Sequence, residues 1–233
     1  MRERPILFSA PMVGALLAGT KTQTRRVVKH AEHIEQFERN ADGSFYYDYL
    51  DELDPAYVRS REVPCPYGQP GDRLWVRENG WQRPADRAEQ GWPYAYDADA
   101  PFGIGAANEA YREEGWKRRP SIHMPRWASR ILLEVTDVRV ERLQDISETD
   151  AIAEGIERSP SMGKPGAFQW CDYRIPHDAA EWFNSPIHSY ETLWDQINGA
   201  GAWAANPWVW AVSFRRVPPT GGISQTPPGG STA

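Results

Sequence analysis

A polar segment near the N-terminus brings together side chains suited to nucleophilic chemistry. Residues 20–26 read TKTQTRR, so one amine, three hydroxyls and two guanidinium groups lie within seven residues. In a strand, Thr24 and Arg26 would share one face. A threonine hydroxyl becomes a nucleophile when a base removes its proton, and a lysine can be that base when burial lowers its pKa. Lys21 and Thr24 are therefore a candidate base and nucleophile, although composition alone favours a solvated surface hairpin.

A carboxylate far along the chain is the second candidate. Residues 146–155 read ISETDAIAEG. Ser147 predicts the N-cap of a short helix over 148–154, and Gly155 predicts its end. Glu154 falls in the last turn, where the helix dipole disfavours a negative charge. This favours the protonated carboxyl group, and a general acid must hold a proton. The alternative is a solvent-exposed helix end with no catalytic role.

Several short elements must position these residues. Ser9 and Gly19 predict the start and end of a helix, and Ser185 and Gly199 bound a second, longer one. Short apolar or alternating runs predict strands over 5–8, 22–28, 73–78, 131–140 and 207–217. Residues 31–70 and 82–120 are interpreted as long irregular insertions, and 217–233 as a disordered Pro/Gly-rich tail. The pattern predicts an α+β fold, a small mixed β-barrel with short flanking helices.

Composition sets limits on the class of protein. The 233 residues are 40% apolar and 25% charged, which fits a packed core. No apolar run is long enough for a transmembrane helix, and residues 1–10 lack the pattern of a secretory signal, so we expect a cytoplasmic protein without membrane contact. The spacing of Cys65, Cys171 and the five histidines does not match that of metal ligands in known sites. Neither a metal site nor a cofactor is predicted.

Charge is unevenly distributed along the chain. The net charge of −6 argues against a wholly basic coat for nucleic acid. Residues 1–30 and 117–130 are nevertheless locally basic, and could hold a phosphate-bearing ligand in one cleft. For each segment alone, a solvated surface is an equally good interpretation.

Together, these motifs resemble the ASCH family of PUA-like β-barrels. The resemblance rests on residues 19–26 (GTKTQTRR), on Gly71-Asp72 before a strand, and on Glu154 at the end of a short helix. Residues 4–8 (RPILF), 67–78 (YGQPGDRLWVRE) and 206–210 (NPWVW) look like the phage and prophage branch of that family. The resemblance implies a single PUA-like domain over 1–216.

Family membership implies a cleft that takes nucleic acid or a modified nucleobase. One branch removes the acetyl group from N4-acetylcytidine, and its Lys, Thr and Glu match Lys21, Thr24 and Glu154. By that resemblance Thr24 attacks the acyl carbon, Lys21 takes its proton, and Glu154 passes a proton to the leaving amine. Arg26 would hold a substrate oxygen or phosphate. Another branch is described as a ribonuclease.

Aromatic and basic residues elsewhere are candidates for substrate binding. Trp75, Arg77, Glu78 and Arg126 lie in or beside the predicted insertions and the second basic segment, where bases could stack on rings and arginines could clamp phosphates. For Trp194, Trp208 and Trp210, periodic patterns favour core packing. Two functions remain open: an amidohydrolase, and a non-catalytic reader of RNA or DNA. A small closed pocket would favour the enzyme, and an open basic groove the reader.

Overall fold

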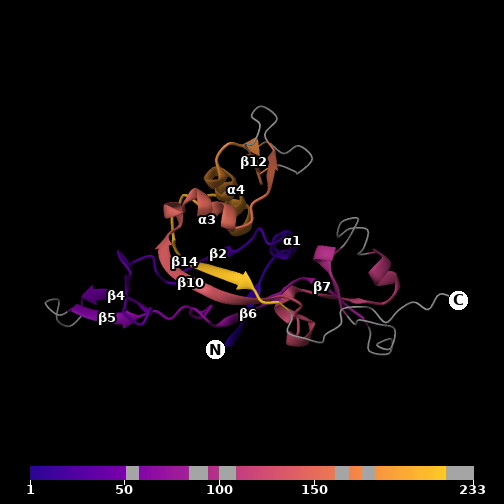
Figure 1. Cartoon of the computed structure of the whole chain (residues 1–233), viewed down its shortest axis with the longest axis horizontal. Helices are drawn as coiled ribbons and strands as arrows, with labels where there is room; N and C mark the ends of the chain where they lie inside the picture. The colour runs from indigo at the N-terminus through magenta and orange to yellow at the C-terminus, as the bar shows by residue number, and fades with distance from the viewer. Residues whose placement is uncertain (51–57, 84–93, 100–108, 161–167, 175–181, 219–233) are drawn as a thin grey trace.

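A computed structural model describes residues 1–50, 58–83, 94–99, 109–160, 168–174 and 182–218 (Figure 1). The fold is mixed α+β, mostly sheet with few helices, as the sequence predicts. All but the first two residues of the predicted tail over 217–233 lie outside the described residues.

A five-stranded sheet forms the centre of the molecule, with strand order β1-β6-β10-β14-β2. β1 is parallel to β6, and the other neighbours are antiparallel. Each strand predicted from the sequence is present. The strands are β1 (Glu3–Leu7), β2 (Gln23–Val27), β6 (Arg73–Arg77), β10 (Leu132–Arg142) and β14 (Trp208–Arg216).

The two edges of this sheet approach each other. β1 and β2 are opposite edges, yet Nη2 of Arg26 on β2 donates a hydrogen bond of 2.6 Å to the carbonyl oxygen of Leu7 on β1. The Arg26 guanidinium also lies 5.4 Å from the centre of the Phe8 ring. The sheet is therefore curled, although the described strands do not form a closed barrel.

Three helices within the described ranges pack on the two faces of the sheet. They are α1 (Ala10–Ala18), α3 (Glu148–Ala153) and α4 (Pro186–Asn198), close to the predicted bounds. The main core includes Ile6, Val13, Leu16, Leu74, Leu133 and Val212, and so joins α1 to the sheet. A second core, with Leu143, Tyr190, Trp194 and Val209, joins α4 to the other face. In Figure 1, α3, α4 and β12 lie together on one side of the sheet.

The expectation of irregular structure over 31–70 and 82–120 is wrong in part, because two small antiparallel sheets lie there. They are β3 (Glu38–Arg39), β4 (Phe45–Leu50) and β5 (Val58–Glu62), and β7 (Gly80–Gln82), β8 (Tyr94–Tyr96) and β9 (Lys117–Arg119). A third, unpredicted sheet contains β11 (Arg158–Pro160), β12 (Phe168–Cys171) and β13 (Trp182–Phe183). Most of these strands have two to five residues, and β3, β5, β9 and β11 are mostly polar, so they show too little apolar alternation to reveal a strand. Short 3₁₀ turns span Asp97–Asp99, Ser121–His123, Arg126–Ala128 and Leu143–Asp145.

A close backbone approach fixes the end of α3 against the start of β2. The backbone N–H of Thr22 donates to the carbonyl oxygen of Ala153 at 2.8 Å. Gly155, just beyond α3, has φ of +80°, and a Cβ there would lie 2.8 Å from Cβ of Lys21 and 3.1 Å from Cβ of Ala15. Only glycine fits both this conformation and this space.

Replacing Gly155 should therefore lower the free energy of unfolding more than replacing a glycine that has a left-handed conformation but open space around it. Gly155→Ala adds overpacking to left-handed strain, and should lower the free energy of unfolding by about 3 kcal/mol. Gly19→Ala is the matched control, because Gly19 has φ of +74° but nothing within 4 Å of an added Cβ. Its expected loss is about 1 kcal/mol. Equal losses in denaturant unfolding would show that the space at Gly155 is not restrictive.

Candidate functional site

Lys21 and Glu154, 133 residues apart, meet inside the protein. Nζ of Lys21 donates to Oε2 of Glu154 at 2.9 Å and to the backbone oxygen of the same residue at 2.7 Å. The Lys21 side chain is 0% exposed and that of Glu154 is 4% exposed. Lys21 lies between Gly19 and β2, and Glu154 is the C-cap residue of α3. The structure thus brings together two of the three residues predicted to be catalytic.

Burial changes the acid–base behaviour of Lys21. Loss of solvent lowers the pKa of its amine, and the charge and hydrogen bond of Glu154 raise it by less. The nearby guanidinium groups of Arg26 and Arg25 act in the lowering direction too. The amine is therefore easier to deprotonate than an exposed lysine, as a base requires.

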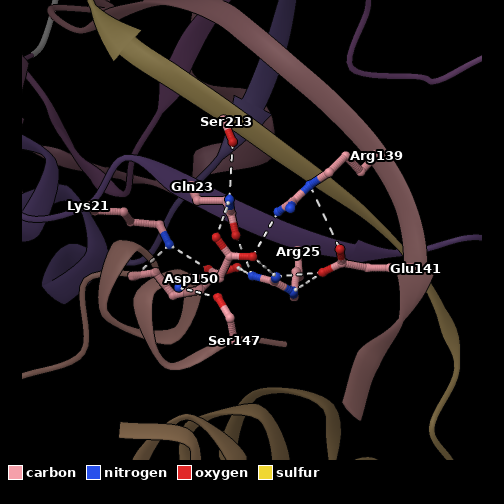
Figure 2. A network of polar contacts seen from close by, with 9 residues as sticks. Lys21, Gln23, Arg25, Arg139, Glu141, Ser147, Asp150 and Ser213 are labelled. Atoms are coloured by element: carbon pink, nitrogen blue, oxygen red, sulfur yellow. Dashed lines mark hydrogen bonds and ion pairs between the residues drawn. The ribbon is translucent and has the colours of Figure 1, made fainter. Parts of the chain in front are cut away.

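Arg25 connects this pair to a larger, partly buried network (Figure 2). Its Nη1 donates to Oε1 of Glu154 at 3.2 Å, and its Nη2 donates to Oε1 of Glu141 at 2.5 Å and Oδ2 of Asp150 at 3.1 Å. Arg139 also donates to Oδ2 of Asp150, at 2.8 Å. Burial opposes the charge of Arg25, but the carboxylates outweigh it and raise the pKa of Arg25. The network joins β2, β10 and α3.

Tyr190 of α4 is a third neighbour of Glu154. Its phenol is buried at the hollow that Glu154 also lines, and burial followed by the charge of Glu154 raises the Tyr190 pKa well above its ordinary value. Sequence reasoning missed both Tyr190 and Arg25. The helical pattern correctly placed Tyr190 on a buried face but carries no sign of a polar contact, whereas the alternation of β2 could have placed Arg25 opposite Thr24 and Arg26.

Thr24 and Glu154 both line a small hollow of about 60 Å³. The hollow is also lined by Arg26, Tyr190 and Trp194, and Thr24 is 2% exposed. Within the described part of the chain, Nζ of Lys21 bonds to Glu154 and not to the Thr24 hydroxyl. Glu154 is therefore bonded to the candidate base and lines the same hollow as the candidate nucleophile.

Glu154 also lines a larger open cleft of about 960 Å³ between α1, the end of α3, β12 and α4. Much of its lining is apolar, from Met12, Ile152, Leu193 and Ile197. The ionisable lining residues include Glu154, Glu157 and Asp172 against a single guanidinium, that of Arg158. The cleft is therefore not the basic groove that a phosphate backbone would need.

Four of the predicted binding residues line neither the hollow nor the cleft: Trp75, Arg77, Glu78 and Arg126. Arg77 and Arg126 stack on the Trp75 ring, 4.8 and 5.7 Å from its centre. Glu78 is 1% exposed and accepts two hydrogen bonds from Arg130, at 3.0 and 2.9 Å. The predicted binding set thus divides: Arg26 is at the hollow, and these four are elsewhere.

The second basic segment is largely neutralised by acidic neighbours. Arg118 forms an ion pair of 2.5 Å with Asp97, and Arg126 one of 2.9 Å with Glu3. Arg130 is paired with Glu78. These pairs explain why a local excess of arginine in the sequence does not create a free basic surface.

No family model, curated protein sequence or solved structure matches the chain, so the ASCH resemblance rests on its motifs alone. Among the residues that the structure describes, no helix has the length and apolar character to cross a membrane. The same residues contain no group of three or more His, Cys, Asp and Glu side chains arranged to hold a metal ion.

Because the buried charges of Lys21 and Glu154 stabilise each other, removing either one should change the free energy of unfolding. Glu154→Gln leaves Lys21 buried without a counter-charge, and should lower the free energy of unfolding by about 3–5 kcal/mol. Lys21→Met should cost less, because Arg25 still holds Glu154. The double variant should lose clearly less than the sum of the two, by about 1 kcal/mol or more in a double-mutant cycle. Additive losses in urea unfolding at pH 7 would mean that the two groups do not interact.

Proposed function

We propose that the chain is an amidohydrolase that removes the acyl group from an N4-acylated cytosine nucleoside. One observation carries this proposal: Glu154, whose carboxylate is ion-paired with buried Lys21, lines a small hollow together with Thr24 and also lines a large cleft. The two cavities share four lining residues, Met12, Glu154, Leu193 and Ile197. The hollow can take the small acyl group of the substrate, while the cytosine ring lies in the cleft.

The proposal includes membership of the ASCH family and a PUA-like barrel as one domain over 1–216. The motifs at residues 19–26 and at Glu154 support it, since their side chains meet in space. The curled sheet, whose edges are bridged by Arg26 and Leu7, is compatible with an open form of such a barrel.

In the first step, the Thr24 hydroxyl oxygen attacks the acyl carbon, and its proton passes to the neutral amine of Lys21 directly or through one water. The carbonyl oxygen becomes an oxyanion. As the tetrahedral intermediate collapses, the bond from the acyl carbon to the exocyclic nitrogen breaks, and Glu154 relays the proton of Lys21 to that nitrogen. The nucleoside leaves with a free amino group, and the acyl group remains on Thr24 as an ester.

In the second step, water attacks the ester carbon and gives a proton to Lys21. The ester bond breaks, the Thr24 oxygen takes the proton back, and the carboxylic acid leaves. Together the two steps consume one water molecule and restore every side chain. Arg25 keeps the Glu154 carboxylate in place throughout.

The cleft favours a free nucleoside over a strand. Its volume of about 960 Å³ lies within the usual range for small-molecule sites, and its lining carries one guanidinium against three carboxylates. The second candidate function, nucleic-acid binding without turnover, is favoured by a different observation: the Trp75 ring with Arg77 and Arg126 stacked on it.

Turnover of N4-acetylcytidine separates these functions. Wild-type protein should release cytidine, and Thr24→Ala should lower kcat by at least about 10²-fold while the substrate still binds. Thr22→Ala is the matched control, because Thr22 is an exposed neighbour and its loss should leave kcat unchanged.

Binding without turnover by the wild type would instead support the reader. Cleavage of an RNA oligonucleotide would support the ribonuclease alternative. If Thr24→Ala were as fast as wild type, the nucleophile would be a water molecule activated by Lys21 and Glu154.

A further inference from the structure

Two residues that line the hollow each carry a buried N–H donor without an acceptor. The indole Nε1–H of Trp194 and the Nε–H of Arg26 have no hydrogen-bond partner among the described residues. Both residues line the hollow beside Thr24. Buried N–H groups in folded proteins are nearly always bonded, so two such donors around one cavity require an explanation.

Neither donor belongs to a loosely packed residue. Trp194 is 5% exposed, lies on α4 and packs against the Tyr190 ring, with centres 6.1 Å apart. Arg26 is held by its hydrogen bond to Leu7 and by the Phe8 ring. The contrast with Trp208 is informative, because the indole N–H of Trp208 donates to the carbonyl oxygen of Ile34 at 2.8 Å.

We propose that the hollow binds the carbonyl oxygen of the substrate's acyl group, with Trp194 Nε1 and Arg26 Nε as its donors. This inference rests on the proposed function, and it makes Trp194 a catalytic residue. The hollow has a volume of about 60 Å³, which suits a carbonyl and a short acyl chain but not a nucleobase. An acceptor that arrives only with the substrate explains why both donors are unpartnered without it.

The electrostatics of the hollow suit an oxyanion. Attack by Thr24 places a negative charge on the carbonyl oxygen, and donors already fixed around that oxygen stabilise it most in the transition state. Glu154 also lines the hollow, but Lys21 and Arg25 hold its two oxygens at 2.9 and 3.2 Å and offset its charge. The Arg26 guanidinium adds a positive charge of its own.

The direct test compares two Trp→Phe substitutions, which keep an aromatic ring and remove the N–H. Trp194→Phe should lower kcat for N4-acetylcytidine by about 10²-fold, as the loss of one oxyanion donor does elsewhere, with KM and Tm close to wild type. Trp208→Phe should show the reverse: a lower Tm, because it loses an existing hydrogen bond, and an unchanged kcat. Wild-type kcat in Trp194→Phe would overturn the inference.

A second measurement keeps the inference testable without turnover. In protein labelled with ¹⁵N at tryptophan, acetamide supplies the carbonyl oxygen and the short chain of an acyl group. It should shift the indole signal of Trp194, assigned with Trp194→Phe, and leave that of Trp208 in place. A shift without hydrolysis of any N4-acylcytidine would retain the carbonyl site and reject the amidohydrolase. An unshifted Trp194 signal would reject the carbonyl site even if the enzyme is active.

Discussion

The ion pair between Lys21 and Glu154 is the interaction on which the rest of the candidate site depends. Two charges that have lost their water must be held close together, because either one alone would be strongly unfavourable in the interior. Their 2.9 Å contact therefore fixes the start of β2 against the end of α3. Arg25 binds the same carboxylate and extends the constraint to β10 through Glu141, and Tyr190 of α4 is buried close to it.

The position of β2 explains why cavities form at this point. β2 is an edge strand, so α1 from one face of the sheet and α4 from the other can both reach its side chains. The hollow is lined from both helices and from β2, and the larger cleft opens beside it. Glu154 lines both cavities, and in the proposed function the scissile bond would lie there, beside Thr24.

Local signals in the sequence were sufficient for the central elements. Ser9, Ser147 and Gly19 marked helix ends that the structure confirms, and apolar runs marked the five strands of the main sheet. The small sheets were not predictable, because strands such as β5 are held by pairing rather than by an apolar face. Arg126 and Glu78 show a related limit: a charged residue in the sequence does not reveal the counter-charge that the fold places beside it.

The ionisation of Lys21 tests most directly whether this site can act as proposed. The chain has four lysines, so Lys21 can be followed by NMR in protein labelled with ¹³C-lysine, with Lys21→Met to assign its signal. Its amine should titrate below the ordinary value of 10.5, because burial lowers the pKa more than Glu154 raises it, and Glu154→Gln should lower the midpoint further. A midpoint at or above 10.5 would contradict a role for Lys21 as the base that activates Thr24.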